Sequence, residues 1–142
     1  MNAIQKKRNQ KVIAALKANK KKAMNEMRNK NGNRCCLCVA EDAAILDGLN
    51  IPKCSLDANF PRNETQDYLG WNDNDPSLVV LPGKSRFFAS EINDSKVGIP
   101  HSVIAEFFAN TFTRKRARLT PKACKFAEKF YTEKSGPEKS IW

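Results

Sequence analysis

The sequence predicts a helix-rich α+β single domain with a small antiparallel sheet or hairpin and with basic arms at both ends. Three observations support this prediction. The chain has 142 residues, which is a typical length for one domain with its own core. Several segments place apolar residues at helical spacing, whereas the strand-like segments are short. Lysine and arginine gather near both ends of the chain.

The net charge of +10 is unevenly distributed along the chain. Residues 1–34 hold eleven basic residues and one acidic residue, residues 35–112 hold five and eleven, and residues 113–142 hold nine and three. We therefore divide the chain into 1–112, an α+β core with a basic N-terminal helix, and 113–142, a basic C-terminal helical extension. Such charge segregation is typical of proteins that bind a polyanion, although lysine-rich termini that only maintain solubility give the same pattern.

The first predicted element is a basic amphipathic helix over residues 3–19. Its narrow apolar stripe consists of Ile4, Val12, Ile13 and Leu16, and lysine and arginine occupy the other faces. In the segment 20–36 that follows, Asn31-Gly32 is a strong turn signal, which predicts a short two-stranded hairpin.

A second helix is predicted where apolar residues recur on one side of residues 37–46, and Gly48 is a typical helix stop. The residues of this side are Leu37, Val39, Ala40, Ala43, Ala44 and Leu46. A third helix is expected to have Pro61 in its first turn and to end at Gly70. The apolar segment 77–83 then predicts a strand closed by a Pro-Gly turn, and residues 86–94 predict another strand.

The strongest helical pattern begins at Pro100. Its apolar positions are Val103, Ile104, Phe107, Phe108 and Phe112, which share one face. We expect this helix to be the central core element and to pack on the alanine face of the 37–47 helix. Thr120 and Pro121 predict the cap and first turn of a last helix. Its apolar stripe comprises Ala123, Phe126, Ala127, Phe130 and Tyr131.

Several short elements follow one another in a characteristic order. They are Arg34, Cys35, Cys36, Leu37 and Val39, then Phe60, Pro61, Leu69, Gly70 and Trp71, then Ile92, Asn93 and Asp94 before the helix at residues 99–108. This order resembles a family of small bacteriophage proteins without a known activity. The resemblance covers residues 11–109 and implies a phage origin and an α+β fold, but no activity. The chain departs from the family at Cys38, where glycine is usual, at Glu41, where many members have cysteine, and in its basic extension after Phe112.

The five cysteines allow three interpretations, of which we favour buried packing. A structural zinc site needs four ligands, and the pair Cys35 and Cys38 would have to recruit isolated residues such as Cys54 and His101. A reactive thiol would need a partner histidine at a known spacing, which the sequence does not show. Cysteine otherwise behaves as a small buried hydrophobe. We expect neither a metal nor another cofactor, and we interpret His101 as a solvated residue at a helix start.

The chemistry of the sequence favours a non-enzymatic binding protein. No phosphate-binding loop, nucleophile elbow or carboxylate–histidine metal motif is present. No apolar run approaches the length of a membrane span, and the first residues lack the apolar segment of a signal peptide, so we expect no membrane contact and a reducing cytoplasm.

The resulting hypothesis is a phage protein that binds nucleic acid or a nucleoprotein inside the host cell, with Trp71 or Trp142 available for stacking. The candidate binding residues are Lys6, Lys7, Arg8, Lys20, Lys21, Lys22, Arg114, Lys115, Arg116 and Arg118. Two alternatives remain open. The chain could bind and inhibit an acidic host protein of defence or transcription, or it could be a minor virion or assembly component.

The preference for buried cysteines yields a first prediction. Protein purified without chelator is expected to contain no stoichiometric zinc when its metal content is measured, because Cys35, Cys36 and Cys38 would serve packing. One zinc ion per chain would contradict this interpretation.

Overall fold

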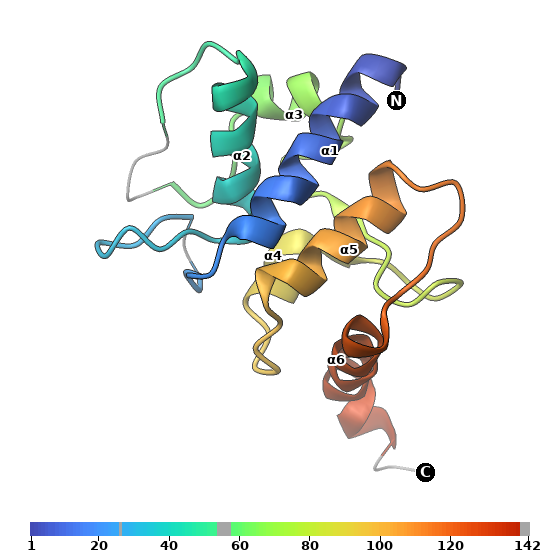
Figure 1. Cartoon of the computed structure of the whole chain (residues 1–142). Helices are drawn as coiled ribbons and strands as arrows, with labels where there is room; N and C mark the ends of the chain where they lie inside the picture. The colour runs from blue at the N-terminus through green and yellow to red at the C-terminus, as the bar shows by residue number, and fades with distance from the viewer. Residues whose placement is uncertain (26, 54–57, 140–142) are drawn as a thin grey trace.

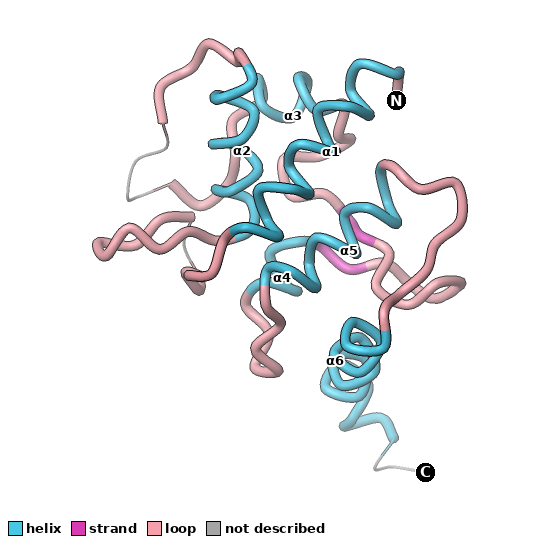
Figure 2. The backbone as a smooth tube through the Cα atoms, in the orientation of Figure 1, coloured by secondary structure: helices cyan, strands magenta, loops and turns pink. Residues whose placement is uncertain are grey.

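The computed structural model describes residues 1–25, 27–53 and 58–139, and it confirms the predicted α+β class. In these residues the elements are α1 (Ala3–Ala18), α2 (Cys36–Asp47), α3 (Asn63–Leu69), β1 (Ser77–Leu78), β2 (Phe87–Phe88), α4 (Ala89–Asn93), α5 (His101–Phe112) and α6 (Pro121–Lys139). The two strands pair antiparallel and lie beside α5 (Figures 1 and 2).

Helix α1 lies at the centre of the helical layer, between α2 and α5 (Figure 1). Its buried side chains Val12, Ile13 and Leu16 follow the predicted stripe, but Ile4 is 63% exposed and lies outside it. The expectation that α5 packs on the alanine face of α2 is wrong, because α1 occupies that space. A helix described as a basic arm on charge alone is therefore part of the core.

The ends of α1 and α2 follow local capping rules. Asn2 and Gln5 form a reciprocal capping box at the start of α1. Cys35 precedes α2, and its Sγ accepts a hydrogen bond from the Cys38 N–H at 3.4 Å. Gly48 ends α2 with a φ of 126°, as predicted. Leu46 was predicted on the buried side of α2, but it is 91% exposed.

The predicted hairpin around Asn31-Gly32 is only partly formed. The chain reverses there, and the Cys35 N–H donates to the Met27 carbonyl at 2.8 Å, but the described residues of this segment form only isolated bridges. These residues are rich in lysine, arginine and asparagine, so the two segments have little apolar surface with which to stabilise a ladder. The sheet instead joins β1 and β2, which lie in the two later segments predicted as strands. After Phe88 the second segment forms α4 and not a longer strand.

Helix α3 packs against the first half of α1. It begins at Asn63, two residues later than Pro61 suggested, and ends at Gly70, whose φ of 70° is left-handed. A Cβ atom at Gly70 would lie 2.6 Å from the Gln5 side chain, so a larger residue does not fit without movement. The Asn9 amide, buried on α1, donates to the Leu69 carbonyl at 2.8 Å and accepts from the Trp71 indole at 2.9 Å.

Helices α5 and α6 match their predicted apolar faces. Phe107 and Phe108 are fully buried, and the Phe108 ring lies 5.8 Å from that of Trp71, measured between centroids. Thr120 caps α6 by accepting a hydrogen bond from the Ala123 N–H at 3.3 Å. In α6, Phe130 is buried in the same core cluster and meets Phe87 edge to face.

The burial of Phe108 leads to a stability prediction. Replacing Phe108 with alanine is expected to lower the free energy of unfolding by about 3–5 kcal/mol, because the change leaves a cavity among aromatic rings. Urea denaturation measures this loss. Phe88→Ala is the matched control, since Phe88 is about half exposed and is expected to cost far less. Equal losses for the two variants would show that the α5 face is not the core.

Candidate functional site

Lysines from opposite ends of the chain meet at the start of α5. A pocket of about 210 Å³ is lined by Lys17, Asn19, Lys20, Lys22, Pro100, His101, Ser102 and Lys122, and we refer to it as the lysine pocket. The lysines at positions 17–22 lie at the end of α1 and just after it, whereas Lys122 lies in the first turn of α6. Four cationic side chains thus line one small cavity.

Two kinds of lysine line this pocket. Lys17, Lys20 and Lys122 are exposed, so their ammonium groups can move towards a ligand. Lys22 is half-buried, and its Nζ donates to the Ile99 carbonyl at 2.7 Å. Burial lowers the pKa of Lys22, while the charge of Asp94 acts in the opposite direction. Lys22 therefore fixes the inner wall of the pocket, and the exposed lysines supply its adjustable charge.

A buried hydrogen-bond network supports the lysine pocket from below. The Asn19 amide is oriented so that all its neighbours are satisfied. In this orientation its NH2 group donates to the Lys21 carbonyl and to His101 Nδ1, and its oxygen accepts from Arg34. His101 Nε2 lies 3.4 Å from Asn93 Oδ1, which also accepts the Cys36 N–H at 3.0 Å. The network thus joins the end of α1, the start of α2 and the start of α5.

His101 is buried, so the interpretation of it as a solvated residue at a helix start is wrong. Only 2% of the residue is exposed. Burial lowers the pKa of His101 to about 4, and the nearby charges of Lys22 and Arg34 act in the same direction. The imidazole is therefore neutral at pH 7, which is consistent with an unprotonated Nδ1 that accepts from Asn19.

The cysteine cluster has the burial that we predicted. Cys36 is fully buried where the turn enters α2, and burial raises the pKa of its thiol well above the ordinary value. Cys35 and Cys38 are buried beside it, while Cys54 lies outside the described residues. Within residues 1–25, 27–53 and 58–139, no three histidine, cysteine or acidic side chains are placed to hold a metal ion. Cys36 is thus a packing residue with a protonated thiol.

The basic segment after α5 is held in a defined shape. Asn110 donates to the Arg118 carbonyl at 2.8 Å and accepts from the Arg114 guanidinium at 2.9 Å. The Glu106 carboxylate accepts from both the N–H and the hydroxyl of Thr120 at 2.9 and 2.7 Å. Arg114 is therefore a structural residue, and Lys115, Arg116 and Arg118 are presented on an ordered, exposed segment.

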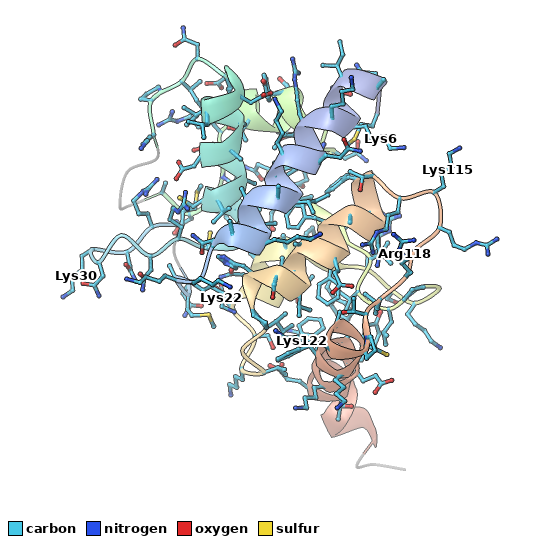
Figure 3. All side chains as sticks on the ribbon, in the orientation of Figure 1. Lys6, Lys22, Lys30, Lys115, Arg118 and Lys122 are labelled. Carbon is cyan, nitrogen blue, oxygen red and sulfur yellow. The ribbon has the colours of Figure 1, made fainter. Side chains whose placement is uncertain are left out.

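The lysine pocket and this segment lie along the same helix. Figure 3 shows Lys22 and Lys122 near the start of α5, and Arg118 and Lys115 towards its end. We define the basic band as the exposed cations of the lysine pocket together with those of the segment after α5. They are Lys17, Lys20 and Lys122 in the pocket, and Lys115, Arg116 and Arg118 in the segment.

The predicted basic residues at the start of α1 have mixed roles. The Arg8 guanidinium lies 3.7 Å above the Tyr68 ring and donates to the Tyr68 carbonyl at 2.9 Å, so it joins α1 to α3. Lys7 is exposed and Lys6 is half-buried. Lys21 is also exposed, but it faces the groove between α1 and α2 and not the lysine pocket.

Trp71 is not available for stacking on a base, contrary to our expectation. It is buried, stacks on Phe112 at 5.9 Å between ring centroids, and donates its indole N–H to Asn9. Trp142 lies outside the described residues.

Comparison of the chain with protein-family models, with curated proteins and with solved structures gave no match. Among the described residues, no helix has both the length and the apolar composition required to cross a membrane. The candidate site therefore rests on its own geometry.

Sequence reasoning missed the roles of four residues that shape this site. Lys17 and Lys122 complete the lysine pocket, although both were counted only in the overall charge. Asn19 and Asn93 carry the supporting network, and Asn93 was noted only in the family resemblance. Helical spacing contains no signal for these contacts, because each one joins segments distant in sequence.

The burial of His101 predicts a pH dependence of stability. Between pH 6.5 and about 4 the unfolded chain binds a proton that the folded imidazole does not bind, so stability falls as the pH decreases through this window. The contribution is about 3 kcal/mol and is fully present above pH 6.5. Urea denaturation of the wild type and of His101→Gln at a series of pH values isolates it, since the carboxylates titrate in both proteins.

As the chain contains one histidine, its imidazole pKa can also be measured directly by NMR. A value near 6.5 or higher in the folded protein would contradict the buried, neutral state.

Proposed function

We propose that this chain is a non-enzymatic binding protein that contacts the phosphate backbone of nucleic acid through the basic band. The observation that carries the proposal is the lysine pocket, where Lys17, Lys20 and Lys22 meet Lys122. Like charges repel when they converge, and an anionic ligand relieves that repulsion. Phosphate groups are the natural ligands for such a cluster.

The dimensions of the band support contacts with several phosphates. Helix α5 has 12 residues and is therefore about 18 Å long. Phosphates of one strand follow one another at about 3.4 Å along the duplex axis, so the band would face about five of them. This is a backbone footprint, and contacts with phosphates carry no direct sequence information. We therefore propose binding with little sequence preference.

The surroundings of the two obvious catalytic candidates also support a binding role. Cys36 is buried with a raised thiol pKa, so little nucleophilic thiolate is available. His101 is buried, and both ring nitrogens face asparagine side chains. Neither group has the accessible, activated state that acid–base or nucleophilic chemistry needs.

The resemblance to small bacteriophage proteins suggests where this binding would occur. A phage origin would place the protein in the host cytoplasm, where nucleic acid or a nucleoprotein is the partner, or in the virion beside packaged DNA. An acidic host protein remains the alternative partner for the basic band, and the salt dependence of binding separates these cases.

Counterion release gives a quantitative test of this proposal. If the six residues of the basic band contact phosphates, the slope of log affinity against log salt on duplex DNA is expected to be about −5. The double variant Lys20→Gln/Lys122→Gln is expected to flatten the slope by about two units, because each lost contact removes about 0.9. Fluorescence anisotropy with a labelled duplex of about 15 base pairs measures both slopes.

The matched control is Lys30→Gln/Lys53→Gln, which removes the same charge from exposed lysines outside the lysine pocket. It is expected to leave the slope nearly unchanged. Equal effects of the two double variants would mean that only net charge matters, and absence of DNA binding at low salt would reject the nucleic-acid proposal.

A further inference from the structure

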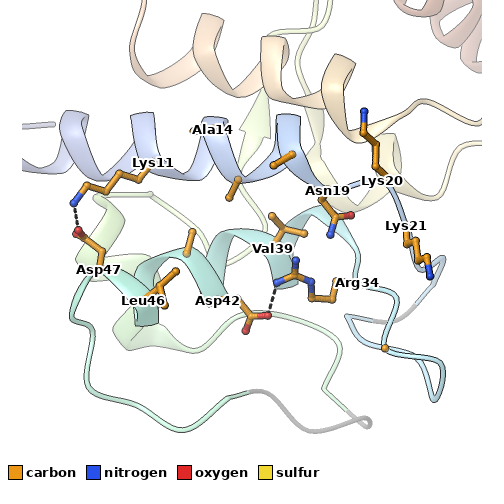
Figure 4. A pocket seen from close by; sticks show the side chains of 14 residues that line it. Lys11, Ala14, Asn19, Lys20, Lys21, Arg34, Val39, Asp42, Leu46 and Asp47 are labelled. Atoms are coloured by element: carbon orange, nitrogen blue, oxygen red, sulfur yellow. Dashed lines mark hydrogen bonds and ion pairs between the residues drawn. The ribbon is translucent and has the colours of Figure 1, made fainter.

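A second concave surface lies on the other side of α1 from the lysine pocket. Helices α1 and α2 run side by side and leave between them a groove of about 790 Å³, which we call the α1–α2 groove (Figure 4). Small side chains line it where the two helices face each other. Those on α1 are Ala14, Ala15 and Ala18, and Ala43 lies on α2.

The groove is apolar at its centre because alanine leaves space that larger residues would fill. Ala14 and Ala18 are exposed, and Val39 provides part of the floor. Leu46 lines the groove from α2 while 91% of its surface is in contact with solvent. Burying an exposed leucine side chain is favourable because it removes apolar surface from water. An occupant of the groove that covers Leu46 would recover this energy.

The two carboxylates of the groove are already neutralised. Asp47 pairs with Lys11 and accepts from the Tyr68 hydroxyl at 2.6 Å. Asp42 accepts from Arg28 and Arg34 at 2.8 and 2.7 Å. The acidic residues therefore do not offset the lysines at the other end of the groove.

That other end is positively charged. Lys20 and Lys21 are exposed there and follow α1. The Lys20 side chain points towards α5, whereas Lys21 lies on the side of Arg34 (Figure 4). Both lysines lie at the far end from the Lys11–Asp47 pair, so the groove is neutral at one end and cationic at the other. A ligand that complements it has an apolar face and negative charge at one end.

We propose that the α1–α2 groove binds a short amphipathic helix of a partner protein, with its apolar face over Leu46 and the alanines and its acidic end at Lys20 and Lys21. The part of α1 that lines the groove runs from Lys11 to Ala18 and is about 10 Å long at 1.5 Å per residue, and Lys20 and Lys21 follow it. This length accommodates about two turns of helix, which is the usual footprint of a helix in a groove, with anchors at positions i, i+3 or i+4, and i+7. This surface shares only Lys20 with the lysine pocket, and the proposal does not rest on the proposed contact with nucleic acid.

Selection from a display library of random peptides about 16 residues long tests this proposal without knowledge of the natural partner. We expect the enriched peptides to share apolar residues at helical spacing and acidic residues at one end. The selected peptide is then labelled and titrated with the full chain. Leu46→Asp is expected to weaken its binding tenfold or more, because one change removes an apolar anchor and adds repulsion.

Ile4→Asp is the matched control, since Ile4 is an exposed apolar residue of α1 outside the groove. It should leave the peptide affinity unchanged. Lys21→Gln should weaken binding of the peptide and make the affinity less dependent on salt. Equal loss for Leu46→Asp and Ile4→Asp, or enrichment of peptides without acidic residues, would overturn the proposal.

A second copy of the chain is the competing occupant. Sedimentation of the wild type and of Leu46→Asp separates the two cases, because a dimer that Leu46→Asp dissociates would replace the partner helix. Retention of DNA binding by Leu46→Asp, together with loss of peptide binding, would show that the groove and the basic band act separately. The single variant Lys122→Gln tests the band alone through its salt slope, because Lys122 lines the lysine pocket and not the groove.

Discussion

The structure depends on the burial of one narrow face of its most basic helix. Val12, Ile13 and Leu16 of α1 lie between α2 and α5, and each such side chain contributes about 1.5–3 kcal/mol when it leaves water. Asn9 on the same helix is buried as well, and its amide is satisfied by Leu69 and Trp71. This polar contact fixes α3 and the segment after it against α1. With one face in the core, the lysines of α1 can occupy only its remaining sides.

The buried network at the start of α5 connects the packing of α1 to the lysine pocket at the surface. Asn93 receives the Cys36 N–H and donates to the Ala23 carbonyl at 2.9 Å, and Asn19 links the end of α1 to His101. Protonation of His101 would add a third positive charge beside Lys22 and Arg34 in a site that is closed to water. The lysine pocket therefore requires a neutral His101. The same buried network fixes the shape of the pocket and holds its lysines in place.

The periodic parts of the fold could be predicted from the sequence, whereas the contacts between elements could not. The apolar face of α5, the stop of α2 at Gly48 and the cap of α6 at Thr120 follow from local rules. The hairpin near Asn31-Gly32 was predicted too strongly, because a turn signal says nothing about whether its flanking residues can be buried. The placement of α1 between α2 and α5 depends on tertiary packing. The many lysine and arginine residues of α1 suggested a surface arm, so its central position was not predicted.

The candidate site shows the same division. Charge counting identified Lys20 and Lys22, but it also included Arg8 and Arg114, which are held by Tyr68 and Asn110. A guanidinium that stacks on a ring or binds a carbonyl is a structural group, and only its partners reveal this. Lys122 entered the site because α6 returns to the start of α5, which no helical period indicates.

Lys20 lines both the lysine pocket and the α1–α2 groove, so the two surfaces share one cation. A carboxylate bound at Lys20 from the groove would reduce the positive potential that a phosphate meets in the pocket. Charges within about 10 Å are screened only partly at 0.1 M salt, so this coupling would weaken as salt increases. An acidic helix and a nucleic acid would therefore oppose each other's binding, and by linkage the opposition would be equal in both directions. Such a coupling would arise at the end of α1, because the buried face of this helix holds that end in place.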